Sequence, residues 1–385
     1  MDMDLSEEQE LLKAAAREFL ERECPPGLVR EVEASELGYS PQLWRQMADL
    51  GWLGLPIPQE YQGFGLGALD LAVLCKEMGR ALCPGPFFPT VVLAGGAIAA
   101  AGTSQQKQSY LPRIAAGDIV IAFALQESSG YYDPRGIATR ATADGNRFVL
   151  NGTKLFVEFA NGADLLLVVA RSEGEPPSTD GLSMFLVDPK SPGVTMTALP
   201  TMARDKQFEV VLQGVEVPRE EVLGPVGQAW PLLEGVIQRG AVAFSAYAVG
   251  ASERMHELAT DFAKDRVQFG RPIGSFQLIQ SYLAQLVTEI WGTETLTYYT
   301  AWALDEGLPA RELVAKTKAF AGDTIKRTTD IGSQIFGGIG YMEEMDTTLF
   351  LRRGKQYQLA MGDTGYWEDI VAEEVLGPVG GRALG

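Results

Sequence analysis

The stretch Arg266-Val-Gln-Phe-Gly-Arg-Pro-Ile-Gly-Ser-Phe-Gln277 is the most informative part of this 385-residue chain. It predicts a helix that ends at a glycine beside Phe269, with the guanidinium of Arg266 one turn earlier. A second helix is expected to follow Pro272 and to carry Gln277. A permanently charged guanidinium suits a pyrophosphate, and an aromatic ring suits stacking on a flat group. On its own, the stretch is equally compatible with a simple helix end.

A second stretch follows two helices later, Gln334-Ile-Phe-Gly-Gly-Ile-Gly-Tyr341. Gln334 offers an amide, and Gly337 and Gly338 let the backbone approach a flat or anionic group closely because they lack side chains. A glycine cluster alone can be only a turn. In this order and in a helical setting, the two stretches together suit a dinucleotide.

The amino-acid composition limits the classes of protein to which this chain can belong. Hydrophobic residues make up 46% and charged residues 21%, which is typical of a globular protein, and 385 residues favour two or three packed regions. The net charge of −18 argues against nucleic-acid binding, which needs a basic surface. Val91–Ala101 is apolar but too short to span a membrane, so we expect a soluble protein.

The chain has few cysteines and histidines for a metal site or for redox chemistry. The cysteines are odd in number and lack the spacing of a zinc site, which favours a reduced, cytoplasmic setting; they are Cys24, Cys75 and Cys83. The single histidine, His256, makes a histidine metal cluster or a Ser-His relay a poor hypothesis, and we interpret it as an ordinary helix residue. The acidic start of the chain fits a helix capped by Ser6 better than a signal peptide.

Periodicity divides the chain into three regions. Helices are expected over 6–23, 41–50, 68–82 and about 90–101. Strands are expected over 119–125, 138–143, 147–150, 153–157, 165–170, 183–187, 194–198 and 208–212. Asp144-Gly145 and Asn151-Gly152 are predicted as hairpin turns. Long helices rich in small residues follow over about 230–269, 275–304, 309–336 and 343–361.

The paired stretches and the order of the three regions resemble the acyl-CoA dehydrogenase family over the whole chain. The resemblance implies an α+β fold: an N-terminal α-helical domain (1–118), a middle antiparallel β domain that cradles a flavin ring (119–224) and a C-terminal four-helix bundle (225–385). It also implies FAD as the cofactor, an acyl-CoA substrate and a dimer or tetramer.

The resemblance assigns residues to the cofactor site. The family segments that face the flavin correspond here to Ala122-Phe-Ala-Leu-Gln-Glu-Ser-Ser-Gly-Tyr-Tyr-Asp133 and Phe156-Val157-Glu158. Gln126 and Glu158 stand where the family has hydroxyl residues; Glu158 either brings negative charge toward the ring or turns to solvent. The implied FAD contacts are Leu125, Gln126, Phe156, Glu158, Arg266, Gln268, Phe269, Phe276, Gln277, Gln334, Gly337, Gly338 and Asp363. The implied substrate contacts are Tyr132, Gln238 and Arg239, with an exposed helix arginine paired to an acid such as Glu234 as the alternative for Arg239.

Both positions at which the family carries its catalytic base lack a carboxylate. In an alignment from Leu351-Arg-Arg-Gly-Lys355, Met361 occupies the glutamate position, and Gln238 occupies the position one residue before the arginine. Neither side chain accepts a proton at neutral pH. Asp363, after a shift of the alignment, and Glu158 are the remaining candidates, and the true base stays unassigned.

The resemblance implies an FAD-dependent oxidoreductase that desaturates the Cα–Cβ bond of a fatty, steroid or aromatic acyl-CoA and passes electrons to an electron-transfer flavoprotein in a bacterial cytoplasm. Two alternatives stay open. One is a subunit that lacks its own base and completes a partner's FAD site, as in paired-subunit family members, where residues like Arg266 and Gln334 reach the neighbour's cofactor. The other is an FAD-binding member that eliminates a β-substituent without removing an α-proton.

Overall fold

The computed structural model of the chain describes residues 4–377. Contacts divide it into two compact units. We call them the helical unit (Met1–Gly27, Gly67–Cys83 and Ala241–Gly385) and the β unit (Leu28–Leu66 and Pro84–Gly240). The predicted domain boundaries after 118 and 224 stay predictions. Residues 1–3 and 378–385 of the predicted outer domains lie outside the described part of the chain.

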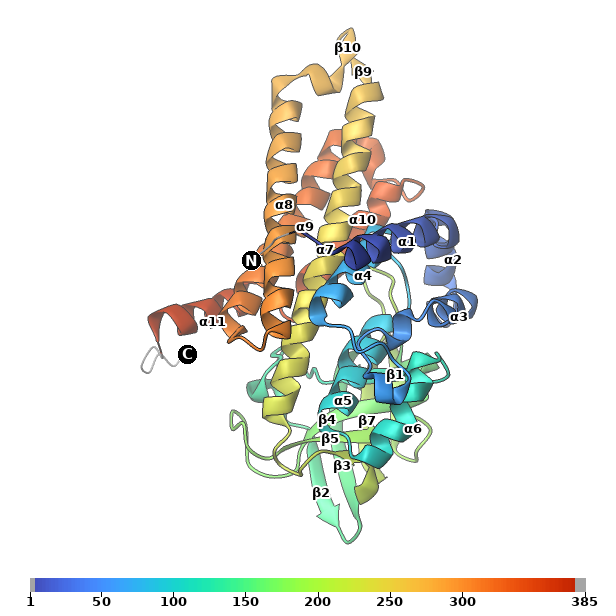
Figure 1. Cartoon of the computed structure of the whole chain (residues 1–385), viewed down its shortest axis with the longest axis vertical. Helices are drawn as coiled ribbons and strands as arrows, with labels where there is room; N and C mark the ends of the chain where they lie inside the picture. The colour runs from blue at the N-terminus through green and yellow to red at the C-terminus, as the bar shows by residue number, and fades with distance from the viewer. Residues whose placement is uncertain (1–3, 378–385) are drawn as a thin grey trace. The chain divides into compact units, whose positions relative to one another are not determined.

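The predicted succession of helical, β and helical regions is confirmed (Figure 1). The first helices are α1 (Glu7–Glu23), α2 (Pro26–Ala34), α3 (Pro41–Asp49) and α4 (Ala68–Arg80). α1 begins as predicted: the Ser6 hydroxyl accepts a hydrogen bond from the Gln9 N–H, and the Gln9 amide oxygen accepts one from the Ser6 N–H. The sequence did not predict α2. Pro26 follows the end of α1 and also starts α2, because the first residue of a helix needs no N–H donor.

The β unit contains further helical segments that lead into its sheet. Phe88–Gly95 is π-helical and continues into α5 (Gly96–Ala101), which together cover the predicted helix over 90–101. α6 (Ser104–Ala115) was not predicted from periodicity, although Thr103 caps it by accepting a hydrogen bond from the Gln106 N–H.

One sheet forms the centre of the β unit. Its strands are β1 (Ile121–Ala124), β2 (Arg140–Asp144), β3 (Arg147–Glu158), β4 (Leu165–Arg171), β5 (Leu182–Val187), β6 (Val194–Leu199), β7 (Gln207–Pro218) and β8 (Val222–Leu223). They lie in the order β6-β7-β3-β2-β4-β5-β8, and β1 also pairs with β4. The sheet is mainly antiparallel as predicted, while β1 and β2 each pair with β4 in parallel. Phe148 and Phe185 meet edge to face in its core, with ring centroids 5.3 Å apart.

The two predicted hairpin turns have different outcomes. β2 and β3 form the predicted hairpin, with Asp144 opposite Arg147. The predicted turn at Asn151-Gly152 is wrong, because β3 continues through it and pairs with β7, with a register shift at Asn151. A Cβ on Gly152 would lie 2.4 Å from the Thr139 hydroxyl oxygen. The glycine therefore allows two segments to approach closely at an irregular strand.

The helical unit contains the long C-terminal helices. They are α7 (Trp230–Asp265, which begins in the β unit), α8 (Gln277–Asp305), α9 (Arg311–Phe336), α10 (Asp346–Leu359) and α11 (Thr364–Leu376). The first four were predicted, but the helix expected to reach 269 ends at Asp265. α11 was not predicted. Its N-cap is Asp363, whose carboxylate accepts a hydrogen bond from the Tyr366 N–H.

Small residues let α4 and α7 pack closely, as the sequence indicated for the long helices. A Cβ on Gly79 of α4 would lie 2.1 Å from the Tyr247 carbonyl oxygen of α7, and a Cβ on Gly250 of α7 would lie 1.8 Å from the Lys76 carbonyl oxygen. Neither distance is compatible with a side chain. The two glycines therefore set the crossing of these helices.

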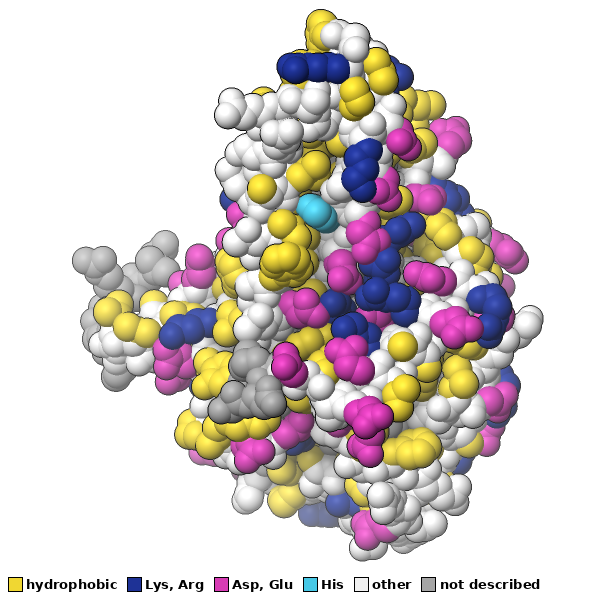
Figure 2. Space-filling view, turned by 45° about the horizontal axis from the view of Figure 1, so that its top comes forward, with side chains coloured by type: hydrophobic (Ala, Val, Ile, Leu, Met, Phe, Trp, Pro, Cys, Tyr) yellow, Lys and Arg dark blue, Asp and Glu magenta, His cyan; other side chains and the backbone are white. Residues whose placement is uncertain are grey.

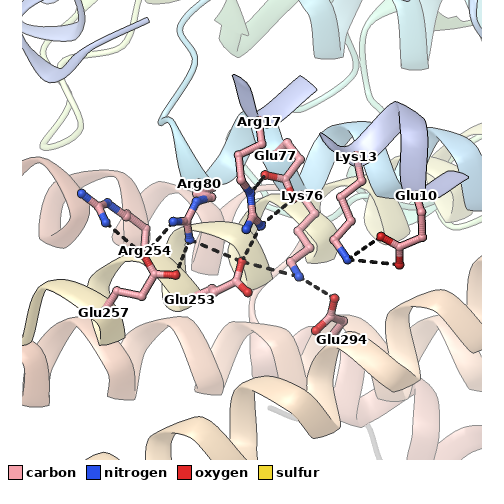
Figure 3. Close-up of polar contacts among 10 residues, drawn as sticks. All are labelled: Glu10, Lys13, Arg17, Lys76, Glu77, Arg80, Glu253, Arg254, Glu257 and Glu294. Carbon is pink, nitrogen blue, oxygen red and sulfur yellow. Dashed lines mark hydrogen bonds and ion pairs between the residues drawn. The ribbon is translucent and has the colours of Figure 1, made fainter. Parts of the chain in front are cut away.

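Ion pairs join α4 to α1, α7 and α8 (Figure 3). The Glu77 carboxylate is fully buried and accepts two hydrogen bonds from Arg17, at 2.8 and 3.0 Å. Lys76, with 3% of its side chain exposed, donates to Glu294 at 2.5 Å. Arg80 forms a two-bond pair with Glu257. Each of these charges has a partner of opposite sign, so none of them is buried without compensation.

Acidic and basic side chains are interspersed on the face shown in Figure 2. Cys24, Cys75 and Cys83 are free cysteines. His256 lies within α7, with its Nε2 atom 3.0 Å from the Leu283 carbonyl oxygen. Within residues 4–377, no helix has both the length and the apolar character needed to cross a membrane.

Candidate cofactor and substrate site

The stretch after α7 forms a short hairpin at the end of the helical unit. β9 (Val267–Gln268) and β10 (Arg271–Pro272) pair antiparallel, and Phe269 and Gly270 form the two-residue turn, both with positive φ (53° and 78°). Such turns favour Asn and Gly, so an aromatic residue there is unusual. The Phe269 side chain is 93% exposed. A strained, exposed aromatic residue at this position marks a candidate contact for a ligand or a partner.

The hairpin holds several residues of the predicted cofactor set. Arg266 is the first residue after α7 and not a residue of the helix itself, and its carbonyl accepts a hydrogen bond from the Ile273 N–H at 2.8 Å. Phe269 and Phe276 lie edge to face, with centroids 6.1 Å apart. The Arg271 guanidinium lies 4.3 Å from the Phe276 ring centroid. Gln268 and Gln277 are exposed on the same segment.

The glycine stretch forms a corner at the end of α9. Gln334 is exposed in the last turn, and Gly337, with φ +69°, ends the helix. A Cβ on Gly337 or on Gly338 would meet no atom within 4 Å, so open space lies above this backbone. The backbone at this corner therefore has room above it for a ligand group, and its role in binding a cofactor stays a prediction.

The hairpin and the glycine corner lie at the same end of the helical unit. Phe262 in the last turns of α7 and Phe336 at the end of α9 are stacked, with ring centroids 4.2 Å apart and planes 16° from parallel. The Arg266 N–H donates to the Phe262 carbonyl, one turn from this contact. Ile273 and Ile335 belong to the same apolar cluster. Figure 1 shows β9 and β10 joining the ends of α7 and α8.

In the β unit, a buried ion pair holds the loop that follows β1. The Lys154 ammonium, with its side chain fully buried in β3, donates to Glu127 Oε1 at 2.6 Å and to the Leu125 carbonyl at 3.1 Å. Glu127 also accepts hydrogen bonds from the N–H groups of Ala138 and Thr139. Burial by itself raises the pKa of Glu127, but the Lys154 charge and these hydrogen bonds outweigh it and hold the pKa below its ordinary value.

The residues predicted to face the flavin lie on this loop and on β3. The Gln126 carbonyl accepts a hydrogen bond from the Leu155 N–H, and its side-chain oxygen accepts one from the Tyr132 hydroxyl at 2.9 Å. The structure thus joins a predicted cofactor residue to a predicted substrate residue. Phe156 has φ +55° at an irregular position of β3 and is 48% exposed. Glu158 is half-buried and is the last residue of β3, opposite Gln207.

Met361 lies in a tightly held connection between α10 and α11. Its side chain is 5% exposed and its φ is +60°. The Trp367 indole N–H donates to the Met361 carbonyl at 2.8 Å. The Lys318 ammonium of α9 donates to the next carbonyl, that of Gly362, at 3.0 Å. The position predicted for a base therefore holds a buried thioether in a fixed backbone conformation.

The other candidates for catalysis and substrate binding differ in their surroundings. Asp363 is exposed and its carboxylate is used as the cap of α11. Gln238 is half-buried and Arg239 is exposed on α7, in the part of that helix that belongs to the β unit. The catalytic role predicted for Asp363 and the substrate contacts predicted for Gln238 and Arg239 stay predictions.

Lys154 and Lys318 are buried polar residues that were not predicted from the sequence. Lys318 carried a usable signal, because it follows Val314 at helical spacing and precedes Ile325, on the apolar stripe of α9. A lysine on such a stripe must find a polar partner inside the protein. Lys154 carried a signal too, because it lies four residues after Leu150 and six after Phe148, on the buried face of β3, but the turn predicted at Asn151-Gly152 interrupted that alternation.

Three protein-family models match consecutive parts of the chain. They describe the N-terminal, middle and C-terminal domains of acyl-CoA dehydrogenases and match residues 6–118, 122–215 and 227–376. Cyclohex-1-ene-1-carbonyl-CoA dehydrogenase of Geobacter metallireducens is 30% identical over 97% of this chain and 99% of its own length. Acryloyl-CoA reductase (NADH) of Anaerotignum propionicum is 29% identical over 98% of this chain and 96% of its own length. A chain of the ChsE4-ChsE5 complex from Mycobacterium tuberculosis superposes with a TM-score of 0.89 and 27% identity, covering 98% of this chain and 100% of that one.

Proposed function

We propose a function from the premise that this chain belongs to the acyl-CoA dehydrogenase family. It is an oxidoreductase that acts on acyl-CoA thioesters. We infer that its reaction is FAD-dependent desaturation of the bond between the α- and β-carbons, with the electrons passing to an electron-transfer flavoprotein. FAD, when bound, supplies the acceptor for the hydride that leaves the β-carbon.

The observation that carries the FAD proposal is the meeting of the Arg266 hairpin with the glycine corner at one end of the helical unit. The open space above Gly337 and Gly338 fits a flat or anionic group, which a side chain at either position would obstruct. Phe269, exposed on a strained turn, offers a face for stacking. The residues present therefore fit a dinucleotide.

Each residue has a definite part in this proposal. Arg266 binds a pyrophosphate through charge-assisted hydrogen bonds, and Gln334 donates from its amide beside the glycine backbone. In the β unit, the Gln126 amide oxygen accepts a hydrogen bond from the Tyr132 hydroxyl, so the NH₂ group is the part of this side chain that can donate to a ligand. That group is the proposed donor to the flavin ring.

Met361 favours a second candidate function, that of a subunit whose partner carries the base. The thioether is buried and cannot accept a proton, so α-proton removal has no group at this position. The similarity to a chain of the two-component ChsE4-ChsE5 complex supports this candidate. In it, Arg266 and Gln334 complete the cofactor site of the neighbouring subunit.

The test begins with the chain purified alone and with the cofactor identified after its release. FAD is expected, and Arg266→Gln is expected to weaken its binding by about tenfold to a hundredfold, because a hydrogen bond to a charged group contributes about 1.5–3 kcal/mol. Arg327→Gln is the matched control, an exposed arginine of α9 that pairs with Glu289. Equal FAD binding by both variants would contradict the assignment of Arg266.

Anaerobic titration then separates the two candidate functions. The oxidised protein is mixed with straight-chain, alicyclic, aromatic and steroid-derived acyl-CoAs, and the dithionite-reduced protein is mixed with the matching enoyl-CoAs. Bleaching or recovery of the flavin absorbance by the chain alone supports a complete enzyme. FAD that stays oxidised with every thioester supports the partner-subunit candidate. A chain that takes up no FAD, even when refolded with an excess of it, contradicts FAD binding by the chain alone.

A further inference from the structure

Lys318 is a buried cation whose hydrogen-bond partners are backbone carbonyls. The side chain lies in the middle of α9 and the residue is 1% exposed. Its Nζ atom donates to the carbonyl oxygens of Tyr357 at 3.3 Å, Gln358 at 3.2 Å and Gly362 at 3.0 Å. Placing an ammonium here is costly, because burial removes its hydration. The same burial lowers the pKa of Lys318 to about 7, although the Asp363 charge opposes the shift.

The acceptors lie at the end of a helix. Tyr357 and Gln358 belong to the last turn of α10, which ends at Leu359, and the carbonyls of a last turn have no partners within their own helix. They also carry the negative end of the helix dipole, which a cation stabilises. Lys318 therefore caps α10 from a neighbouring helix.

The third acceptor extends this cap to the connection that follows α10. Gly362 comes directly after Met361, so the Lys318 bonds lie on both sides of that residue. Trp367, 3% exposed on α11, holds the Met361 carbonyl itself. Gly362 has φ +97°, and a Cβ there would lie 2.5 Å from the Tyr366 ring and 2.8 Å from the Trp367 indole nitrogen. The backbone of 361 is thus fixed in the left-handed region, which a residue other than glycine seldom adopts.

We propose that Lys318 is a positioning residue for position 361. Its ammonium, together with the Trp367 indole, fixes the place and direction of the side chain at that position, which in this chain is a thioether. The inference rests on the proposed function in one respect, namely that position 361 is where the family carries its base. The hydrogen bonds from Lys318 and Trp367, which we call the clamp, belong to this chain whatever its reaction is. The clamp holds whichever side chain occupies 361, so a carboxylate introduced there should be positioned in the same way.

The first test is structural and needs no substrate. Hydrogen exchange of the peptide covering 357–363 and the ¹³C-methyl signal of Met361, assigned with Met361→Leu, are compared between the native protein and Lys318→Met. At pH 6, where Lys318 carries its proton, Lys318→Met is expected to speed exchange about tenfold to a hundredfold and to move the Met361 signal, because charge-assisted hydrogen bonds worth about 1.5–3 kcal/mol are lost. Lys326→Met, an exposed lysine of the same helix, is the control and should change neither.

Unchanged exchange and an unchanged methyl signal in folded Lys318→Met would overturn the inference. If Lys318→Met does not fold, Trp367→Phe removes only the indole donor and is expected to give the same signature more weakly. An unmoved Met361 signal in that variant would overturn the inference as well.

The second test adds a carboxylate. Met361→Glu is compared with Met361→Glu/Lys318→Met for the rate at which an acyl-CoA bleaches the flavin, at equal FAD content. The double variant is expected to be at least tenfold slower, and a double variant as fast as Met361→Glu would overturn the positioning role. Failure of the proposed function appears differently: FAD is then missing from the native protein, while the exchange experiment still reports on the clamp.

Discussion

Replacing Lys154 with methionine removes the ammonium of the buried pair in the β unit while keeping a side chain of similar length. The Glu127 carboxylate, 10% exposed, then keeps only the hydrogen bonds from the Ala138 and Thr139 N–H groups. Loss of one partner of a buried ion pair costs about 3–5 kcal/mol in the free energy of unfolding. Because two backbone donors remain, we expect a loss near the lower end, about 3 kcal/mol.

The stability lost in Lys154→Met depends on pH, and the pKa of Glu127 fixes the direction of this dependence. In the native protein the pKa of Glu127 lies below its ordinary value of 4.5, so the pair stabilises the fold above that value and the stabilisation is lost as the pH falls through the folded-state pKa. In Lys154→Met the charge that lowers this pKa is absent, and burial raises it. The folded variant then binds a proton more readily than the unfolded chain. Its stability should therefore increase as the pH falls from about 7 to about 5, where the native protein shows no such gain.

Urea unfolding at several pH values measures both effects, and hydrogen exchange of the peptides around Gln126 and β3 locates them. Lys190→Met, at an exposed position of the same unit, is the control. Glu127→Gln/Lys154→Met should recover most of the loss, because it leaves no unpaired charge. The reasoning is refuted if Lys154→Met loses less than about 1 kcal/mol, or if its stability does not increase toward acid pH. A Lys154→Met protein that retains the fold is also expected to bind FAD more weakly, because the loop carrying Gln126 is released.

Two further predictions concern single positions. Gly152→Ala should lower the free energy of unfolding by about 1–3 kcal/mol, because its Cβ would meet the Thr139 hydroxyl at 2.4 Å, whereas Gly235→Ala, with no atom within 4 Å, should not; thermal unfolding of the two variants measures the difference. Lys318, with a folded-state pKa of about 7 against an ordinary value of 10.5, makes the native protein bind fewer protons than the unfolded chain between those values, so its contribution to stability should rise by about 2 kcal/mol from pH 6 to 8.5. Urea unfolding across this range should show that Lys318→Met lacks the rise, and a rise of equal size in the variant would contradict the buried-lysine assignment.

Some features of this protein follow from local sequence alone. The capping of α1 by Ser6, the hairpin between β2 and β3 and the order of helical and strand regions depend on neighbouring residues, whose spacing is visible in the sequence. The resemblance to the acyl-CoA dehydrogenase family likewise followed from two short stretches. The sequence also shows that position 361 carries a methionine and not a carboxylate, once the family alignment identifies this position as that of the base.

Other features depend on contacts between residues far apart in the chain. The stacking of Phe262 on Phe336 brings the Arg266 hairpin to the glycine corner, and no periodicity in either segment predicts that contact. The turn predicted at Asn151-Gly152 failed for the same reason: the pairing of β3 with β7 outweighs the local preference for a turn.

The two buried lysines show the distinction most clearly. A lysine is favoured at the surface by its own chemistry, and only a partner supplied by another segment makes its burial tolerable. For Lys154 that partner is Glu127, 27 residues earlier, and for Lys318 it is the set of carbonyls at the end of α10. The sequence by itself determined which side chains this protein has for binding a cofactor and which it lacks for catalysis. The tertiary structure decided which of them meet, because the energy of a buried charge depends on neighbours that the order of residues does not reveal.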